Sequence, residues 1–119
     1  MIDFACKEFK IEDVIKCALN LTRADLKVMK FFINHEEEGL STEALSQALE
    51  LDLSTVQRSV KKLYEKEVLR RVQQNLDGGG YVFIYRGQPK SEIRGVIMEI
   101  VRTWVDRVEK EFEEWDHKL

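Results

Sequence analysis

From Pro89 to the C-terminus, no residue interrupts a helical spacing of apolar side chains. Proline is tolerated in the first turn of a helix, so Pro89 marks a place where one can begin. The pattern predicts a helix of about 28 residues, roughly 42 Å long at 1.5 Å per residue. Because a body of about 90 residues cannot cover so long a helix, part of it should be available to another chain.

One stripe of this predicted helix is apolar, with steps of three or four residues between its members. They are Ile93, Ile97, Ile100, Trp104, Val108, Phe112 and Trp115. A heptad-like stripe is what two helices need in order to share an apolar seam. It predicts that residues 90–119 form a dimerisation helix that projects from a domain of residues 1–89. The alternative is a core helix packed within one subunit.

Composition supports a single, mostly helical domain. Of the 119 residues, 44% are hydrophobic and 34% charged, too apolar for a disordered tail. The chain has one Pro and six Gly, which disfavours a turn-rich sandwich. The longest apolar run, Tyr81–Tyr85, is far shorter than a membrane span, and the N-terminus lacks the pattern of a secretory signal. We therefore expect a soluble, cytoplasmic protein with no membrane partner.

Helical spacing and capping signals predict four helices before residue 67. Thr22 with Asp25, and Ser54 with Gln57, have capping-box spacing, so each pair should open a helix. The expected helices are about Phe9–Leu19, a Thr22-capped helix reaching His35, Glu43–Leu49 beginning at Ser41 or Thr42, and Thr55–Lys66.

After Val68 the pattern changes from helical to extended. Leu69–Gln74 and Tyr81–Arg86 read as two strands, and three consecutive glycines lie between them. Glycine readily adopts the positive φ angles of a hairpin loop, so the two strands should form an antiparallel hairpin.

Positive charge is concentrated in one part of an acidic chain. The net charge is −3, yet residues 54–71 contain six basic and two acidic side chains. On a helical wheel of residues 55–66, Val56, Val60 and Leu63 form an apolar back and Arg58 lies almost opposite. A helix with an apolar back and a cationic front suits the major groove of DNA. The alternative is that the basic side chains only face solvent and bind no ligand.

The order of these elements resembles the winged-helix transcription regulators, in particular the small archaeal regulators of the TrmB/MarR-like group. The segment from Leu40 to Leu63 looks like their helix-turn-helix, and Val68–Arg86 looks like their wing. The resemblance implies a mostly α fold with a small β-hairpin wing, a recognition helix (55–66) in the major groove of double-stranded DNA, and a wing (69–86) on the backbone. The candidate DNA-binding residues are Ser41, Thr42, Ser54, Thr55, Gln57, Arg58, Ser59, Lys61, Lys62, Arg70 and Arg71.

Two departures from this family bear on function. The wing loop has Asn75 and Asp77 but no Arg or Lys, although MarR-like wings usually carry a basic tip. The chain also lacks the long effector domain of larger TrmB-like proteins, so a small-molecule effector is not supported. The competing hypothesis is therefore a winged-helix module for protein contact, used as an adaptor subunit.

The remaining polar residues show no pattern of an enzyme. We find no phosphate-binding glycine loop, nucleophile elbow or zinc spacing, so we expect no catalytic site, metal or cofactor. Cys6 and Cys17 are expected to be buried and inert, although a redox-responsive regulator using them is an open alternative.

Overall fold

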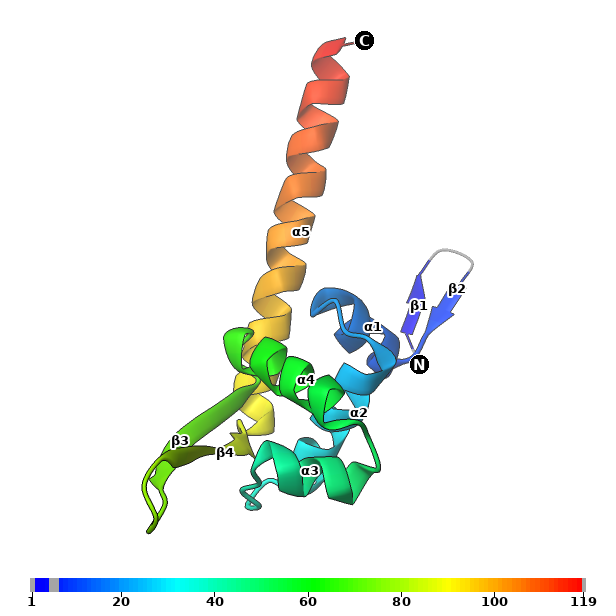
Figure 1. The fold of residues 1–119 in the computed structure, drawn as a ribbon. Helices are drawn as coiled ribbons and strands as arrows, with labels where there is room; N and C mark the ends of the chain where they lie inside the picture. Colours follow the sequence, from blue (N-terminus) through cyan, green and yellow to red (C-terminus); the bar gives the residue numbers. More distant parts are fainter. Residues whose placement is uncertain (1, 5–6, 119) are drawn as a thin grey trace.

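The computed structural model describes residues 2–4 and 7–118 and shows a small body from which one long helix projects (Figure 1). Its extents, 69 × 27 × 25 Å, reflect this projection. In chain order the elements are β1 (Ile2–Phe4), β2 (Lys7–Phe9), α1 (Ile11–Ala18), α2 (Arg23–Asn34), α3 (Thr42–Leu49), α4 (Leu53–Glu65), β3 (Leu69–Asn75), β4 (Tyr81–Gly87) and α5 (Lys90–Lys118). The predicted fold class is confirmed, since the structure is mostly helical with a hairpin wing and a long C-terminal helix.

The N-terminal hairpin is the one pair of strands that the sequence did not indicate. β1 and β2 are antiparallel, with Ile2 opposite Phe9. Each strand has only three residues, and Ala5-Cys6 contains none of the glycines or prolines that mark a turn. Without a turn signal, strands this short cannot be recognised from their alternation.

The start of α2 confirms the predicted capping box. The Thr22 hydroxyl accepts a hydrogen bond from the Asp25 N–H (3.1 Å), and the Asp25 carboxylate accepts one from the Thr22 N–H (2.9 Å). Reciprocal bonds of this kind satisfy backbone donors that have no partner inside the helix. The capping box therefore fixes where α2 begins.

The second predicted capping box is wrong. α4 begins at Leu53, with Asp52 as its N-cap residue, so Ser54 already lies inside the helix. The Ser54 hydroxyl donates to the Asp52 carboxylate instead of accepting from Gln57. The preceding turn is tight because Glu50 adopts a left-handed conformation (φ 54°), which brings α4 back across α3.

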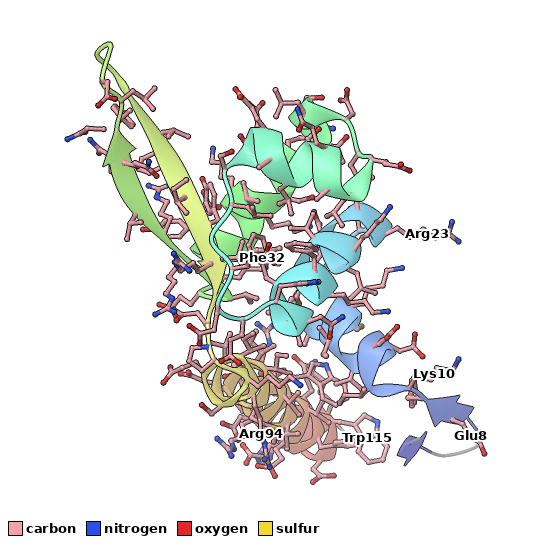
Figure 2. All side chains as sticks on the ribbon, turned by 90° about the horizontal axis from the view of Figure 1, so that it is seen from below. Glu8, Lys10, Arg23, Phe32, Arg94 and Trp115 are labelled. Atoms are coloured by element: carbon pink, nitrogen blue, oxygen red, sulfur yellow. The ribbon has the colours of Figure 1, made fainter. Side chains whose placement is uncertain are left out.

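The core lies where α2, α3, α4 and the base of the wing meet, with Phe32 at its centre (Figure 2). The apolar back predicted for α4 is confirmed, since Val56, Val60 and Leu63 are fully buried. Burying a Val, Leu or Phe side chain stabilises the fold by roughly 1.5–3 kcal/mol. Hydrophobic packing thus fixes the orientation of α4, and its opposite side faces outward.

The wing is the predicted antiparallel hairpin of β3 and β4. Leu69 pairs with Gly87 at its base and Asn75 with Tyr81 at its tip. In the loop, Gly79 (φ 97°) and Gly80 (φ 79°) adopt the positive φ angles for which glycine was expected. Backbone hydrogen bonds in both directions between Leu40 and Tyr85 attach the wing to the segment before α3.

The long helix α5 begins in the body and leaves it (Figure 1). Ile93 and Ile97 belong to the core, so the expected segments 1–89 and 90–119 share one apolar interior. Beyond Val101, every residue except Val108 is exposed as far as Lys118. Within the part of the chain that the structure describes, no helix combines the length and apolar character needed to cross a membrane.

Candidate nucleic-acid interface

The outward side of α4 gathers most of the polar residues predicted to contact DNA. Ser54, Gln57, Arg58 and Lys61 are exposed, and Thr55 is half-buried. The Arg58 guanidinium lies 3.4 Å from the Thr55 hydroxyl, one helical turn earlier. These side chains form one hydrogen-bonding surface, which we call the α4 face. Ser41 and Thr42, at the start of α3, are half-buried, and the Ser41 hydroxyl caps that helix through the Ala44 N–H (3.2 Å).

Ser59 does not belong to this surface, and its assignment as a base contact is wrong. Its side chain is 1% exposed, and its hydroxyl donates to Asp25 at 2.6 Å. Ser59 lies four residues before the buried Leu63 and three after the buried Val56, which places it on the inner side of the helix. The helical spacing therefore contained the signal for its burial.

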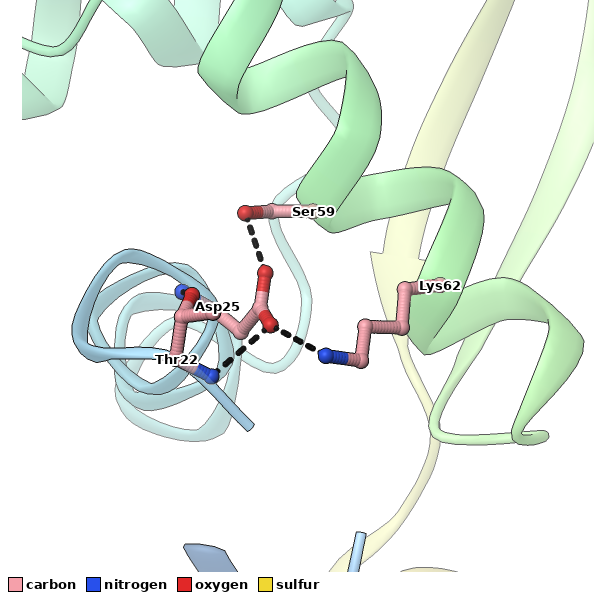
Figure 3. Close-up of polar contacts among 4 residues, drawn as sticks. All are labelled: Thr22, Asp25, Ser59 and Lys62. Carbon is pink, nitrogen blue, oxygen red and sulfur yellow. Dashed lines mark hydrogen bonds and ion pairs between the residues drawn. The ribbon is translucent and has the colours of Figure 1, made fainter. Parts of the chain in front are cut away.

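Lys62 is also directed toward the protein's own interior. Its ammonium contacts the Asp25 carboxylate at 2.9 Å, and the side chains are 29% and 6% exposed respectively. Figure 3 shows both Ser59 and Lys62 reaching from α4 to Asp25 at the start of α2. Lys62 was expected to meet a DNA phosphate, but its charge here is matched by a carboxylate. This contact fixes the orientation of α4 on α2.

Asp25 is charged despite its burial. Burial raises the pKa of the Asp25 carboxyl, but hydrogen bonds from Ser59, the Thr22 N–H and Lys62 lower it further than burial raises it. The net result is a pKa below its ordinary value of 3.8. A buried carboxylate with donors on both oxygens is a stable anchor, because each donor favours its charged form.

Arg71, a predicted wing contact, is held between two aromatic rings. Its guanidinium carbon lies 4.1 Å from the ring centre of Tyr64, on α4, and 4.1 Å from that of Phe83, on β4. Cation–π contacts of this kind are worth about 0.5–1 kcal/mol when partly exposed. Arg71 therefore braces the wing against the end of α4, whereas the neighbouring Arg70 is exposed.

We expect Arg71→Ala to lower the free energy of unfolding by about 1–2 kcal/mol, because both ring contacts are lost. Urea unfolding followed by circular dichroism measures this difference. Arg70→Ala is the matched control, since it removes an equal charge from the same strand without disturbing a ring. Equal effects of the two substitutions would show that the ring contacts do not stabilise the wing.

The structure adds Leu53 to the candidate interface, beside the N-cap residue of α4. Asp52 and Leu53 are exposed at the leading end of α4, beside Ser54. Leu53 offers an apolar surface, and contacts of that kind recognise the methyl group of thymine. The sequence did not indicate Leu53 because Ser54 also matches the N-cap residue of a helix that begins at Thr55.

Among the described residues, three exposed cations around this face form no ion pair. Within residues 2–4 and 7–118, ion pairs join Lys30 to Glu12 and Lys62 to Asp25. Arg58 and Lys61 on α4 and Arg70 on the wing therefore carry charge that the described protein does not neutralise. A surface of this kind can bind phosphate groups.

The predicted dimerisation residues divide into two sets. Ile93 and Ile97 are 5% and 8% exposed, so placing them on a seam between subunits is wrong. They pack against the subunit's own core because the first turns of α5 cover it. Four residues of the stripe remain substantially exposed, and Val108 is half-buried among them. The exposed residues are Ile100 (37%), Trp104 (60%), Phe112 (59%) and Trp115 (54%).

The prediction of buried thiols is wrong for Cys17, and the redox alternative stays a prediction. Cys17 is an exposed free thiol on α1, and Cys6 lies outside the described residues. Among the residues that the structure describes, no three His, Cys, Asp or Glu side chains come together in a way that could hold a metal ion.

Comparison with solved structures supports both the fold and the broad class. A possible transcriptional regulator from Methanosarcina mazei Go1 is 65% identical, with a TM-score of 0.90 over 97% of this chain and 96% of that one. A protein of the archaeon Sulfolobus tokodaii is 21% identical, with a TM-score of 0.66 over 82% of this chain and 93% of that one. The protein MepR of S. aureus, solved in complex with DNA, is 15% identical, with a TM-score of 0.55 over 89% of this chain and 82% of that one.

These similarities confirm the resemblance to small archaeal and MarR-like winged-helix regulators. The Methanosarcina relative is described as a possible transcriptional regulator, which points away from an enzyme. The family model of the DnaD N-terminal domain matches residues 8–108, a span from the second strand of the N-terminal hairpin through most of α5. This family is not predicted from the sequence motifs. With a match over most of its length, the chain belongs to the DnaD N-terminal domain family.

Proposed function

We propose that this protein is a homodimeric transcription regulator that binds double-stranded DNA at specific sequences. The observation that carries the proposal is the α4 face. It combines two cations that form no ion pair with the described residues, Arg58 and Lys61, with the exposed polar side chains of Ser54 and Gln57. The Methanosarcina relative, described as a possible transcriptional regulator, supports the same role.

The residues of the α4 face have separate tasks in this proposal. Arg58 and Gln57, on the outward side, contact base edges in the major groove, and Lys61 contacts phosphate. Arg70 on β3 contacts the backbone from the wing. Lys62 and Arg71 act indirectly, because their contacts with Asp25, Tyr64 and Phe83 set the angles of α4 and the wing.

Selection of bound sites from random duplexes, followed by anisotropy titrations at several salt concentrations, tests the function. We expect a palindromic consensus and an affinity that falls steeply with salt. Lys61→Ala should weaken binding to all sequences alike and reduce the salt slope by about one, whereas Arg58→Ala should lose about 1–3 kcal/mol of discrimination at one base position.

Lys62→Ala is the internal control for this experiment. It removes the same charge as Lys61→Ala, one residue away on the same helix, but from a side chain engaged with Asp25. Its salt slope should therefore stay close to that of the original protein. Equal slopes for all three proteins would contradict the assignment of Lys61. A protein without salt-dependent DNA binding would instead support the adaptor hypothesis, which the absence of Arg and Lys from the wing tip favours.

A further inference from the structure

The exposed stripe on α5 contains charged residues as well as apolar ones. Arg107, Glu111 and Lys118 lie along the same surface as Trp104, Val108, Phe112 and Trp115. Glu111 follows Trp104 by seven residues, or about two turns, which places it within the stripe and not at its edge. Any partner that covers the stripe must therefore accommodate a carboxylate.

Arg107 does not neutralise Glu111 within the helix. The two residues are four apart, a spacing at which an ion pair can form, but the described ion pairs involve neither side chain. Both charges are therefore available to a partner, and the best partner presents a cation at the level of Glu111 and an anion at the level of Arg107.

A second copy of this helix meets that requirement in one orientation only. In a parallel, in-register pair, every residue lies level with its own copy, so Glu111 would face Glu111 and Arg107 would face Arg107. In an antiparallel pair centred on residue 109, Glu111 of each copy lies level with Arg107 of the other. Because the dimer is symmetric, the contact between Arg107 of one copy and Glu111 of the other occurs twice.

The charges and the bulky side chains farther along α5 favour the same orientation. Residues 109–116 contain five acidic side chains and one basic one, so parallel pairing would bring two acidic ends together. Antiparallel pairing places that end level with residues 102–109, whose two basic and two acidic side chains give no net charge, so the repulsion between two acidic ends is avoided. It also brings Trp104 level with the partner's Phe112–Trp115 end, where two rings already pack edge to face at 6.1 Å.

We propose that two copies of this chain pair through the distal halves of α5 in antiparallel orientation, with reciprocal contacts between Arg107 and Glu111. The proposal rests on the homodimer of the proposed function and adds its geometry. The two bodies then lie at opposite ends of the helix pair, so the two α4 faces are separated along the helix axis and not clustered at one end.

Glu111→Gln distinguishes the two orientations by the sign of its effect. In the antiparallel dimer the substitution removes two attractive contacts, so the dimer dissociation constant should rise about 3- to 10-fold. In a parallel dimer it would relieve repulsion, and the constant should fall. Sedimentation equilibrium measures the constant. Glu113→Gln is the matched control, because Glu113 lies half a turn out of phase with Trp104 and should leave dimerisation unchanged.

Disulfide trapping provides a second readout that does not depend on affinity. In a background of Cys6→Ser and Cys17→Ser, Val108→Cys lies beside the two-fold axis and should cross-link on oxidation. Lys118→Cys should not, because antiparallel pairing separates the two copies of this residue by about 27 Å along the axis. Efficient cross-linking of Lys118→Cys, or a tighter dimer with Glu111→Gln, overturns the orientation while leaving the dimer and DNA binding intact. A protein that is monomeric at all concentrations but still binds DNA overturns the pairing itself and leaves the DNA-binding proposal standing.

Discussion

Replacing Asp25 by alanine should lower the free energy of unfolding by about 2–4 kcal/mol. The substitution removes the carboxylate that accepts from Ser59 at 2.6 Å and from Lys62 at 2.9 Å, and it removes one bond of the α2 capping box. It leaves a buried hydroxyl and a half-buried ammonium without their partner, and groups left in this way cost more than the net gain of the original bonds. Urea unfolding of the two proteins gives the difference directly.

Asp13→Ala is the matched control for this substitution. Asp13 also accepts from a backbone N–H at a helix start, that of Lys10 at 3.2 Å, but this contact is exposed. Losing an exposed cap costs about 0.5–1 kcal/mol. If the two substitutions had equal effects, the buried contacts with Ser59 and Lys62 would contribute nothing to stability.

The contribution of Asp25 should also depend on pH in a defined direction. Its carboxyl has a lower pKa in the folded protein than in the unfolded chain, where the ordinary value is 3.8. Its charged form therefore stabilises the fold above that pH, and the stabilisation is lost as the pH falls through the folded pKa. The difference in unfolding free energy between the original protein and Asp25→Ala should shrink as the solution is acidified below about pH 4.

Phe112→Glu should give the largest effect on binding. Phe112 is 59% exposed on the stripe, between Val108 and Trp115. Burying a new carboxylate in an apolar interface without a partner is strongly unfavourable, so the protein should become monomeric at micromolar concentration. Because the proposed dimer holds two recognition helices on one site, losing it should reduce DNA affinity by about 100-fold or more.

Sizing chromatography with light scattering, combined with anisotropy titration on the selected site, measures both effects. Lys110→Glu is the control, since it also places a carboxylate on α5 but about 200° around the helix from Phe112. It should remain dimeric and bind DNA nearly as well as the original protein. A monomeric Phe112→Glu protein that binds with unchanged affinity would separate DNA recognition from dimerisation.

Much of the fold could be predicted from local patterns because each depends on residues close in sequence. Thr22 and Asp25 form the expected capping box, Gly79 and Gly80 take the positive φ angles of the expected loop, and Val56, Val60 and Leu63 form the buried side of α4. The predicted start of α4 is wrong because Ser54 and Asp52 are both common N-cap residues, and the local sequence does not distinguish them. In the structure Asp52 is the N-cap residue and the helix begins at Leu53, directly after the turn that follows α3.

The candidate site was predicted less well, because contacts with residues distant in sequence decide which of its side chains are available to a ligand. Lys62 and Arg58 look equivalent in a list of basic residues, but Asp25, 37 positions before Lys62, contacts only one of them. Arg71 and Arg70 are adjacent, but only Arg71 lies between the rings of Tyr64 and Phe83. Ile93 and Ile97 belong to the same apolar stripe as Trp104, and their spacing alone does not distinguish them from it. Only the tertiary structure shows that the protein's own core covers these two residues and leaves Trp104 exposed.

The sequence by itself determined where the helices and the wing form and which side of α4 is apolar, since periodicity, caps and turns act over a few residues. The tertiary structure decided which cations remain available to a ligand and how much of α5 remains available to a partner. The physical reason is that a charge is neutralised, and an apolar side chain is covered, by whatever the folded chain brings beside it.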